Sequence, residues 1–292
     1  MTNNNKKWIL LLILSVIWGS SFILIKKSLV GLTPLQVGSL RIIFTAIVIS
    51  IYSYSSLKEI PKESWKWIIL TAYIGTFFPV YLVSFGQTEI ESGLASIITT
   101  LTPINTLIIG IIFFSLTFTI KQVVGLVVAF FGGILLLYNG GISPSYNVYF
   151  SIFIFFTTVG YGASVNLIKT YLTEISPSAV TAGIFLSILP PAILVLFCSD
   201  FFVLKFDQSN IYESILFVFL LALFSSAIAQ TLFNRFVKLA SPLFASAVTY
   251  LMPIVAIFWG AIDGEVLSLK QYVATVIILS GVYLVNNKQK TN

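Results

Sequence analysis

A chain of 292 residues in which 58% are hydrophobic and only 9% are charged has too few charges to cover a water-facing surface, because an ordinary soluble domain carries about 25% charged residues. The net charge of +6 comes from basic residues scattered among apolar segments, which argues against a nucleic-acid-binding face. The absence of histidine and the single cysteine, Cys198, exclude His-dependent nucleophile pairs, helical His zinc sites and an intrachain disulfide framework. We therefore expect no metal ion and no cofactor.

Apolar segments of membrane-spanning length recur along the chain. About 20 apolar residues cross a hydrocarbon core of about 30 Å, and runs close to that length alternate with short polar breaks. The runs lack the period-two alternation of a membrane β-barrel. We predict an all-α integral membrane protein with ten transmembrane helices, near residues 8–25, 34–54, 65–85, 92–114, 120–138, 148–170, 177–198, 213–235, 241–261 and 268–286.

The distribution of basic residues predicts the orientation. If the N-terminus is cytoplasmic, eleven basic residues fall on the inner side: Lys6, Lys7, Lys58, Lys62, Lys66, Lys121, Lys169, Arg235, Lys238, Lys288 and Lys290. Four fall on the outer side: Lys26, Lys27, Lys205 and Lys270. Cytoplasmic loops carry the excess of Lys and Arg, so we expect both termini in the cytoplasm of a bacterial cell, with the protein in its inner membrane.

An internal repeat divides the chain into halves of residues 1–142 and 143–292. The first alignment has no gap and pairs Pro34 with Pro177, Lys26 with Lys169, and Trp18-Gly19-Ser20-Ser21 with Tyr161-Gly162-Ala163-Ser164. The second pairs Pro103 with Pro253 and Ala95-Ser96 with Ala245-Ser246. Five spans per half is an odd number, so the second half would enter the membrane from the opposite side. Inverted repeats of this kind are an architecture of secondary transporters.

Several of these residues also carry a family resemblance: Trp18-Gly19-Ser20-Ser21-Phe22, Lys26, Leu32-Thr33-Pro34, Arg41, Gly93-Leu94-Ala95-Ser96, Pro103, Pro253, Gly260, Gly264-Glu265 and Gly281. In their order, spacing and duplication the chain resembles the EamA family of the drug/metabolite transporter superfamily over nearly its whole length. The resemblance implies a ten-helix carrier of small polar or amphipathic metabolites, often an exporter of amino acids, with a central cavity between the halves. Where the family commonly has a Gly-Glu pair before the fifth span, this chain has Ser115-Leu116-Thr117.

Arg41 is the one cation clearly inside a predicted span. A cation at the bilayer centre costs about 2.5–3.5 kcal/mol on insertion scales, so it is a functional candidate. The alternative is that the side chain reaches the outer interface. Lys26 and Lys169 end equivalent spans, where anchoring at the interface competes with a role in gating or substrate contact. Pro103 and Pro253 stand mid-span, and we expect them to form paired kinks that face the axis between the halves.

The remaining candidate substrate-binding residues are aromatic or polar side chains within spans: Trp18, Tyr81, Thr99, Thr102, Asn105, Tyr161, Asn166, Gln230 and Tyr250. A cavity for an amphipathic ligand needs aromatic walls and a few polar groups. Polar residues within a membrane equally join helix to helix, and aromatic residues equally pack.

No carboxylate lies deep in a predicted span, because Glu89, Glu91 and Glu265 stand near outer ends. Proton-coupled drug antiport usually needs an intramembrane acid, so a zwitterionic or neutral substrate fits better. We predict a secondary transporter that exports small amphipathic metabolites such as amino acids, by alternating access through a cavity between the repeats. The alternatives are a multidrug or lipophilic-compound efflux carrier and, less favoured, a channel or a membrane enzyme. The expected partners are a small molecule and membrane lipid, with no nucleic acid, and monomer and homo-oligomer both stay open.

Overall fold

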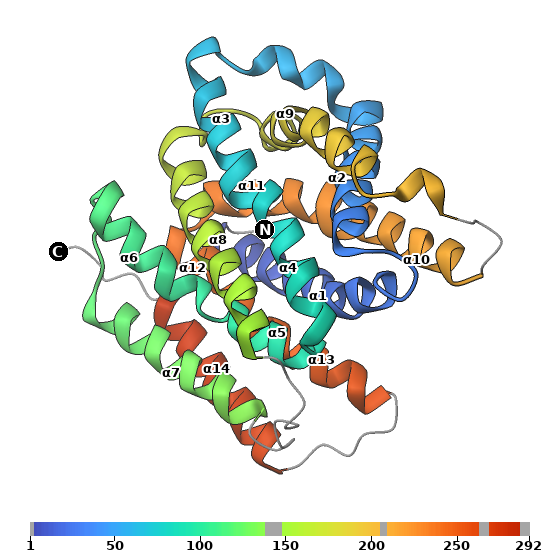
Figure 1. The fold of residues 1–292 in the computed structure, drawn as a ribbon. Coiled ribbons are helices and arrows are strands. Elements are labelled where there is room, and N and C mark those ends of the chain that lie inside the picture. The colour runs from blue at the N-terminus through green and yellow to red at the C-terminus, as the bar shows by residue number, and fades with distance from the viewer. Residues whose placement is uncertain (1–2, 138–147, 205–208, 263–268, 287–292) are drawn as a thin grey trace.

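The computed structural model describes residues 3–137, 148–204, 209–262 and 269–286. All regular structure in these ranges is helical, as predicted (Figure 1). The predicted boundary between the halves, at 142/143, and Glu265 lie outside the described residues. In chain order the α-helices are α1 (Asn3–Ser28), α2 (Pro34–Ser53), α3 (Trp65–Ala72), α4 (Phe78–Glu89), α5 (Ser92–Thr99), α6 (Thr102–Phe114), α7 (Ile120–Leu137), α8 (Ser151–Tyr171), α9 (Pro177–Phe197), α10 (Ser209–Leu220), α11 (Ala229–Leu239), α12 (Pro242–Ser246), α13 (Val248–Ile262) and α14 (Leu269–Asn286).

Seven helical segments of the described chain are long and apolar enough to cross a membrane: Asn5–Ser28, Pro34–Glu59, Lys62–Glu89, Ser92–Phe114, Ser151–Tyr171, Pro177–Phe197 and Asn210–Leu239. Three shorter apolar helices, Ile120–Leu135, Pro242–Val255 and Val273–Val285, lie where the fifth, ninth and tenth spans are expected. Large apolar side chains such as Ile51 and Phe113 are 82% and 73% exposed. An outer surface of this kind is suited to lipid, and a crossing by all ten segments stays a prediction.

Helices begin where a hydroxyl residue precedes proline. Thr33 accepts a hydrogen bond from the backbone N–H of Gln36, and the Gln36 side chain accepts one from the backbone N–H of Thr33, so a complete capping box starts α2. Ser176 caps α9 through the N–H of Ala179, and Ser241 caps α12 in the same way. Proline is at the first turn of each of these helices, where its missing N–H has no consequence. The predicted starts at residues 34 and 177 are therefore confirmed.

Four of the helical segments depart from regular α-helix within their length. π-Helical stretches at Tyr73–Phe77 and Leu221–Ile228 join α3 to α4 and α10 to α11. The segments Ser92–Phe114 and Pro242–Ile262 break at residues 100–101 and at residue 247. The expectation of paired proline kinks is wrong in detail, because Pro103 lies in the first turn of α6, after the break, whereas Pro253 lies inside α13. The backbone turns before each proline, where the chain leaves α5 and α12.

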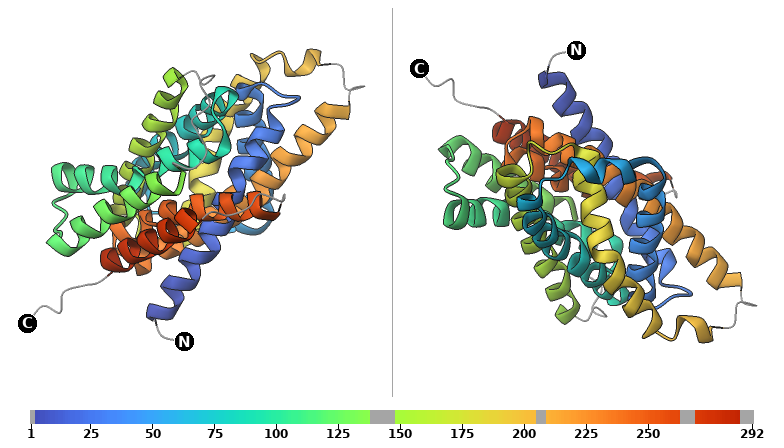
Figure 2. Two further views of the ribbon diagram at one scale, coloured as in Figure 1. Left: turned by 90° about the horizontal axis from the view of Figure 1, so that it is seen from below. Right: turned by 90° about the horizontal axis from the view of Figure 1, so that it is seen from above.

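Helices α2 and α9, and helices α7 and α14, pack against each other in antiparallel pairs. In the pair α2–α9, the Gln36 side chain donates to the backbone oxygen of Ser199 at one end, and Ser176 donates to the Glu59 carboxylate at the other. In the pair α7–α14, a Cβ built on Gly281 would lie 2.6 Å from the Gly125 oxygen, so the backbones touch (Figures 1 and 2). Helix α1 packs on α11 and α13, and α8 packs on α4 and α6.

Candidate functional site

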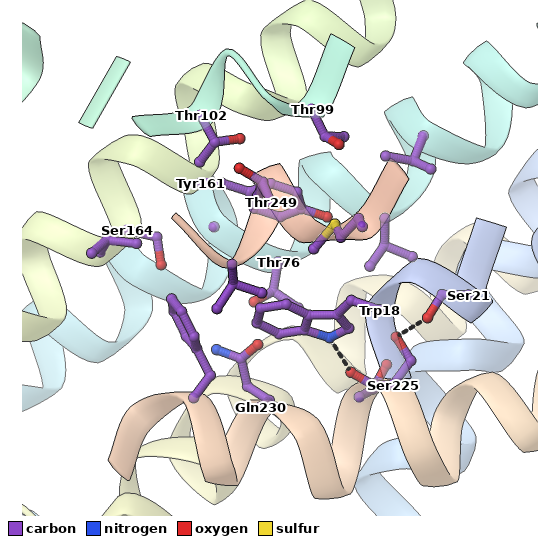
Figure 3. A pocket seen from close by; sticks show the side chains of 18 of the residues that line it. Trp18, Ser21, Thr76, Thr99, Thr102, Tyr161, Ser164, Ser225, Gln230 and Thr249 are labelled. Atoms are coloured by element: carbon purple, nitrogen blue, oxygen red, sulfur yellow. Dashed lines mark hydrogen bonds between the residues drawn. The ribbon is translucent and has the colours of Figure 1, made fainter. Parts of the chain in front are cut away.

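A cavity of about 110 Å³ lies between the helices of the two halves, with room for several water molecules. Its wall includes residues at the midpoints of their spans, such as Trp18 in Asn5–Ser28, Tyr161 in Ser151–Tyr171 and Ser225 in Asn210–Leu239. Both π-helical stretches reach it, through Thr76 in the first half and Ser225 in the second (Figure 3). Such stretches occur often at functional sites.

Ser225 joins the two halves beside this cavity. The Trp18 indole Nε1 donates to the Ser225 backbone oxygen over 2.9 Å, and the Ser21 hydroxyl donates to Ser225 Oγ over 2.9 Å (Figure 3). Arg41 Nη2 donates to Ser225 Oγ over 2.9 Å, and Arg41 Nε donates to Ser226 Oγ over 2.8 Å. Three side chains of the first half therefore converge on one π-helical stretch of the second.

Arg41 is directed into the bundle and does not reach the outer interface. It carries the one formal charge among the residues of the cavity wall, and no Asp or Glu of the described chain lies against it there. Tyr161 lies on the same cavity wall. Of the two sequence interpretations of Arg41, the structure therefore favours a place on the cavity.

The rest of the wall is aromatic, aliphatic and hydroxyl-bearing. The rings of Trp18 and Phe233 are tilted against each other with centroids 5.0 Å apart. Gln230 lies beside Trp18 (Figure 3). The hydroxyl groups of Thr99 and Thr249 donate hydrogen bonds to backbone oxygens of their own segments. The buried hydroxyl of Thr102 has no hydrogen-bond partner among the described residues. This combination suits an amphipathic molecule.

Six of the ten candidate substrate-binding residues lie on this wall: Trp18, Arg41, Thr99, Thr102, Tyr161 and Gln230. The other four join helices elsewhere. Tyr81 bonds to Ser39 over 2.9 Å, and Asn105 donates to Thr158 over 2.8 Å. Asn166 donates to the backbone oxygen of Thr106. Tyr250 is fully buried and its hydroxyl donates to the backbone oxygen of Leu126 over 3.0 Å.

Lys26 and Lys169 cap the C-terminal ends of neighbouring helices. The Lys26 ammonium donates to the Gln87 backbone oxygen in the last turn of α4, over 3.0 Å. The Lys169 ammonium donates to the Val237 and Lys238 oxygens in the last turn of α11, over 3.0 and 3.1 Å. Carbonyls of a last turn lack partners within their helix and favour a cation. These contacts favour anchoring, although the anchor is another helix and not the interface.

Several residues of the wall were not among the sequence candidates: Ser21, Thr76, Ser164, Ser225, Ser226 and Ser246. The repeat contains a signal for most of them. An offset of 150 carries Gly75 and Thr76 onto Ser225 and Ser226, and all four line the cavity. The earlier offset of 143 carries Ser21 onto Ser164.

A helical bundle of membrane-spanning length with an amphipathic cavity at mid-span has the architecture of a membrane transporter. Comparison with known proteins identifies the family of this chain. The model of the EamA-like transporter family matches residues 6–138 and 149–287. The chain belongs to this family, which makes it a multi-pass membrane transporter of a small molecule and not an enzyme.

Two relatives are similar to this chain over most of their length. An uncharacterized transporter of Archaeoglobus fulgidus is 27% identical over 290 residues, which are 97% of this chain and 100% of that protein. The uncharacterized inner membrane transporter YedA of Escherichia coli is 26% identical over 287 residues, covering 93% of this chain and 88% of YedA. A crystal structure at 16% identity superposes with a TM-score of 0.71 over 96% of both chains, which supports the fold.

Proposed function

We propose that the protein is a bacterial inner-membrane secondary transporter that exports small amphipathic metabolites such as amino acids by alternating access. Its halves, residues 1–142 and 143–292, are taken as inverted repeats that rock about the cavity. The observation that carries this proposal is the composition of the wall. Many of its members come in repeat-equivalent pairs, among them Trp18 with Tyr161, Thr76 with Ser226, Val83 with Phe233, and Thr99 with Thr249.

The packing of the helices supports the inversion. A two-fold axis in the membrane plane would relate each helix of one half to an antiparallel helix of the other half. The pairs α2–α9 and α7–α14 are antiparallel in this way. The first helix of each half, α1 or α8, packs against the third and fourth spans of the other half. A cavity on such an axis opens to opposite sides when the halves exchange conformations. With the excess of Lys and Arg on the inner side, both termini are cytoplasmic.

The substrate class follows from the wall. Aromatic and aliphatic side chains provide apolar surface, while hydroxyl groups and Arg41 provide polar contacts. A cationic drug would meet a cation and no carboxylate among the described wall residues, which disfavours the multidrug alternative for cations. Small amphipathic metabolites with a polar end fit both parts of the wall.

Counterflow in proteoliposomes tests this proposal. Vesicles containing the purified protein are preloaded with one unlabelled amino acid or related metabolite, and uptake of the labelled compound is followed with and without a pH gradient. We expect saturable, time-dependent overshoot for amphipathic members of the panel, reduced in Trp18→Ala. Uptake that rises linearly with concentration would favour a channel. Absence of overshoot across a panel that includes lipophilic compounds, with protein shown to be folded, would contradict the proposal.

A further inference from the structure

We infer that the recognised group of the substrate is a single carboxylate, bound by the free edge of the Arg41 guanidinium, and that an α-amino group is not recognised. This inference rests on the proposed function and narrows its substrate class to amphipathic monocarboxylates. Amino acids are then carried for their carboxylate and apolar body, and acids that lack an amino group are carried at least as well.

The hydrogen bonds of Arg41 leave one edge of its guanidinium open. The group has five N–H donors in a fixed plane. Nε uses its hydrogen on Ser226, and Nη2 uses one of two on Ser225. The remaining N–H of Nη2 and both of Nη1 have no acceptor among the described residues. One N–H of Nη1 and the remaining N–H of Nη2 point in the same direction at the end of the guanidinium, and together they form a fork that matches the two oxygens of a carboxylate.

Ser225 and Ser226 fix this fork in place. Ser225 is itself held, since Trp18 donates to its backbone oxygen and Ser21 donates to its hydroxyl. A guanidinium held by hydrogen bonds at Nε and Nη2 loses little conformational freedom when it binds a ligand. Preorganisation of this kind favours affinity. The hydroxyl groups hold the cation without neutralising it, because serine carries no charge.

The charge of the cavity distinguishes between ligand classes. The described wall holds one positive charge and no negative one. An unpaired charge in a low-dielectric site is unfavourable. A monoanion is therefore preferred, because it brings the net charge of the cavity and its ligand to zero. A zwitterion leaves this net charge at +1, and its ammonium group would contact only neutral oxygens and aromatic faces. A cation raises the net charge to +2, and a dianion lowers it to −1.

The repeat places this charge on one side of a wall whose residues are mostly paired by the two offsets. An offset of 143 carries Arg41 onto Ile184, whose neighbour Phe185 lines the cavity. The positions equivalent to Ser225 and Ser226 are Gly75 and Thr76. One half therefore provides the guanidinium and the other provides its serine anchors, while the equivalent corner is apolar or weakly polar. The substrate should lie with its carboxylate at Arg41 and its apolar body toward the opposite corner.

Four probes with the same phenyl-bearing body separate the charge classes: 3-phenylpropanoate as the anion, phenylalanine as the zwitterion, 3-phenylpropanamide as the neutral compound and phenylalanine amide as the cation. Binding is measured as ligand-dependent stabilisation of the purified protein against heat. We expect the anion to half-saturate at a concentration equal to or below that of phenylalanine, and about 10- to 100-fold below those of the amides, the range given by hydrogen bonds to a charged group.

Arg41→Gln should remove the preference for the anion and leave the weak binding of 3-phenylpropanamide within about threefold, which also shows that the variant is folded. Arg41→Lys keeps the charge but loses the fork, and we expect a preference between those of the native protein and the glutamine variant. Equal affinity for anion and neutral amide in the native protein, a preference for phenylalanine over the anion, an unchanged preference in Arg41→Gln, or no stabilisation by any probe would overturn the inference. Binding of the anion without counterflow would instead contradict the proposed function.

Discussion

Replacement of Gly281 by alanine is expected to destabilise the protein by about 1–3 kcal/mol, the range for overpacking a tight contact. A Cβ at this position would lie 2.6 Å from the Ala129 nitrogen and 2.6 Å from the Gly125 oxygen. Both atoms belong to the backbone of α7, so neither can rotate away as a side chain would. The two helices must separate, and close approach through small residues is a main source of helix association in membranes.

Gly133 provides the matched control on the other helix of the same pair. A Cβ built there meets only the Thr100 side chain, at 3.6 Å or more, which is ordinary contact. Gly133→Ala should therefore be neutral or stabilising by up to about 1 kcal/mol, since alanine is the better helix former. Thermal melts of both variants in the same detergent make the comparison. Equal melting temperatures for the two variants would mean that α7 and α14 do not touch as described.

Placing a phenyl ring in the cavity is expected to reduce transport strongly in a folded protein. Thr249 lines the cavity, is 6% exposed, and bonds only within its own segment, to the backbone oxygen of Ser246. Thr249→Phe loses this local hydrogen bond and fills space that the substrate requires. We expect counterflow to fall about tenfold or more, corresponding to at least about 1.4 kcal/mol of lost substrate binding.

Val276 supplies the control for an added ring. It is 66% exposed on α14, where a larger apolar side chain has room in lipid. Val276→Phe should keep both its melting temperature and its counterflow near the native values. If Thr249→Phe transports normally with an unchanged melting temperature, the cavity is not the substrate pathway.

The sequence predicted the fold class well because membrane helices obey strong local rules. The helices that start at Pro34 and Pro177 agree with the spans predicted near 34–54 and 177–198, and a hydroxyl residue followed by proline both caps and begins each of them. The π-helical stretches were missed, because no local pattern in Tyr73–Phe77 distinguishes them from α-helix. They depend on packing between spans, such as the close approach of Gly160 to the Ile74 backbone oxygen, which leaves no room for a Cβ.

The cavity was predicted in part, and the errors have one physical origin. A polar side chain in a span must find a partner, but its residue type does not reveal whether the partner is a substrate or another helix. Asn166 and Tyr250 have backbone partners on neighbouring helices, whereas Arg41 and Trp18 have partners at the cavity. Ser225 and Ser226 were overlooked because serine is common in apolar spans, although the repeat offset relates them to Gly75 and Thr76.

Alternating access to the cavity is the central claim, and chemical modification from each side of the membrane tests it most directly. In a Cys198→Ser background, Thr76→Cys places a single thiol on the cavity wall at mid-span. A small membrane-impermeant methanethiosulfonate is added to the outside or to the inside of sealed vesicles. We predict modification from either side alone, slowed by a bound substrate. Modification from one side only, under every condition, would contradict the account.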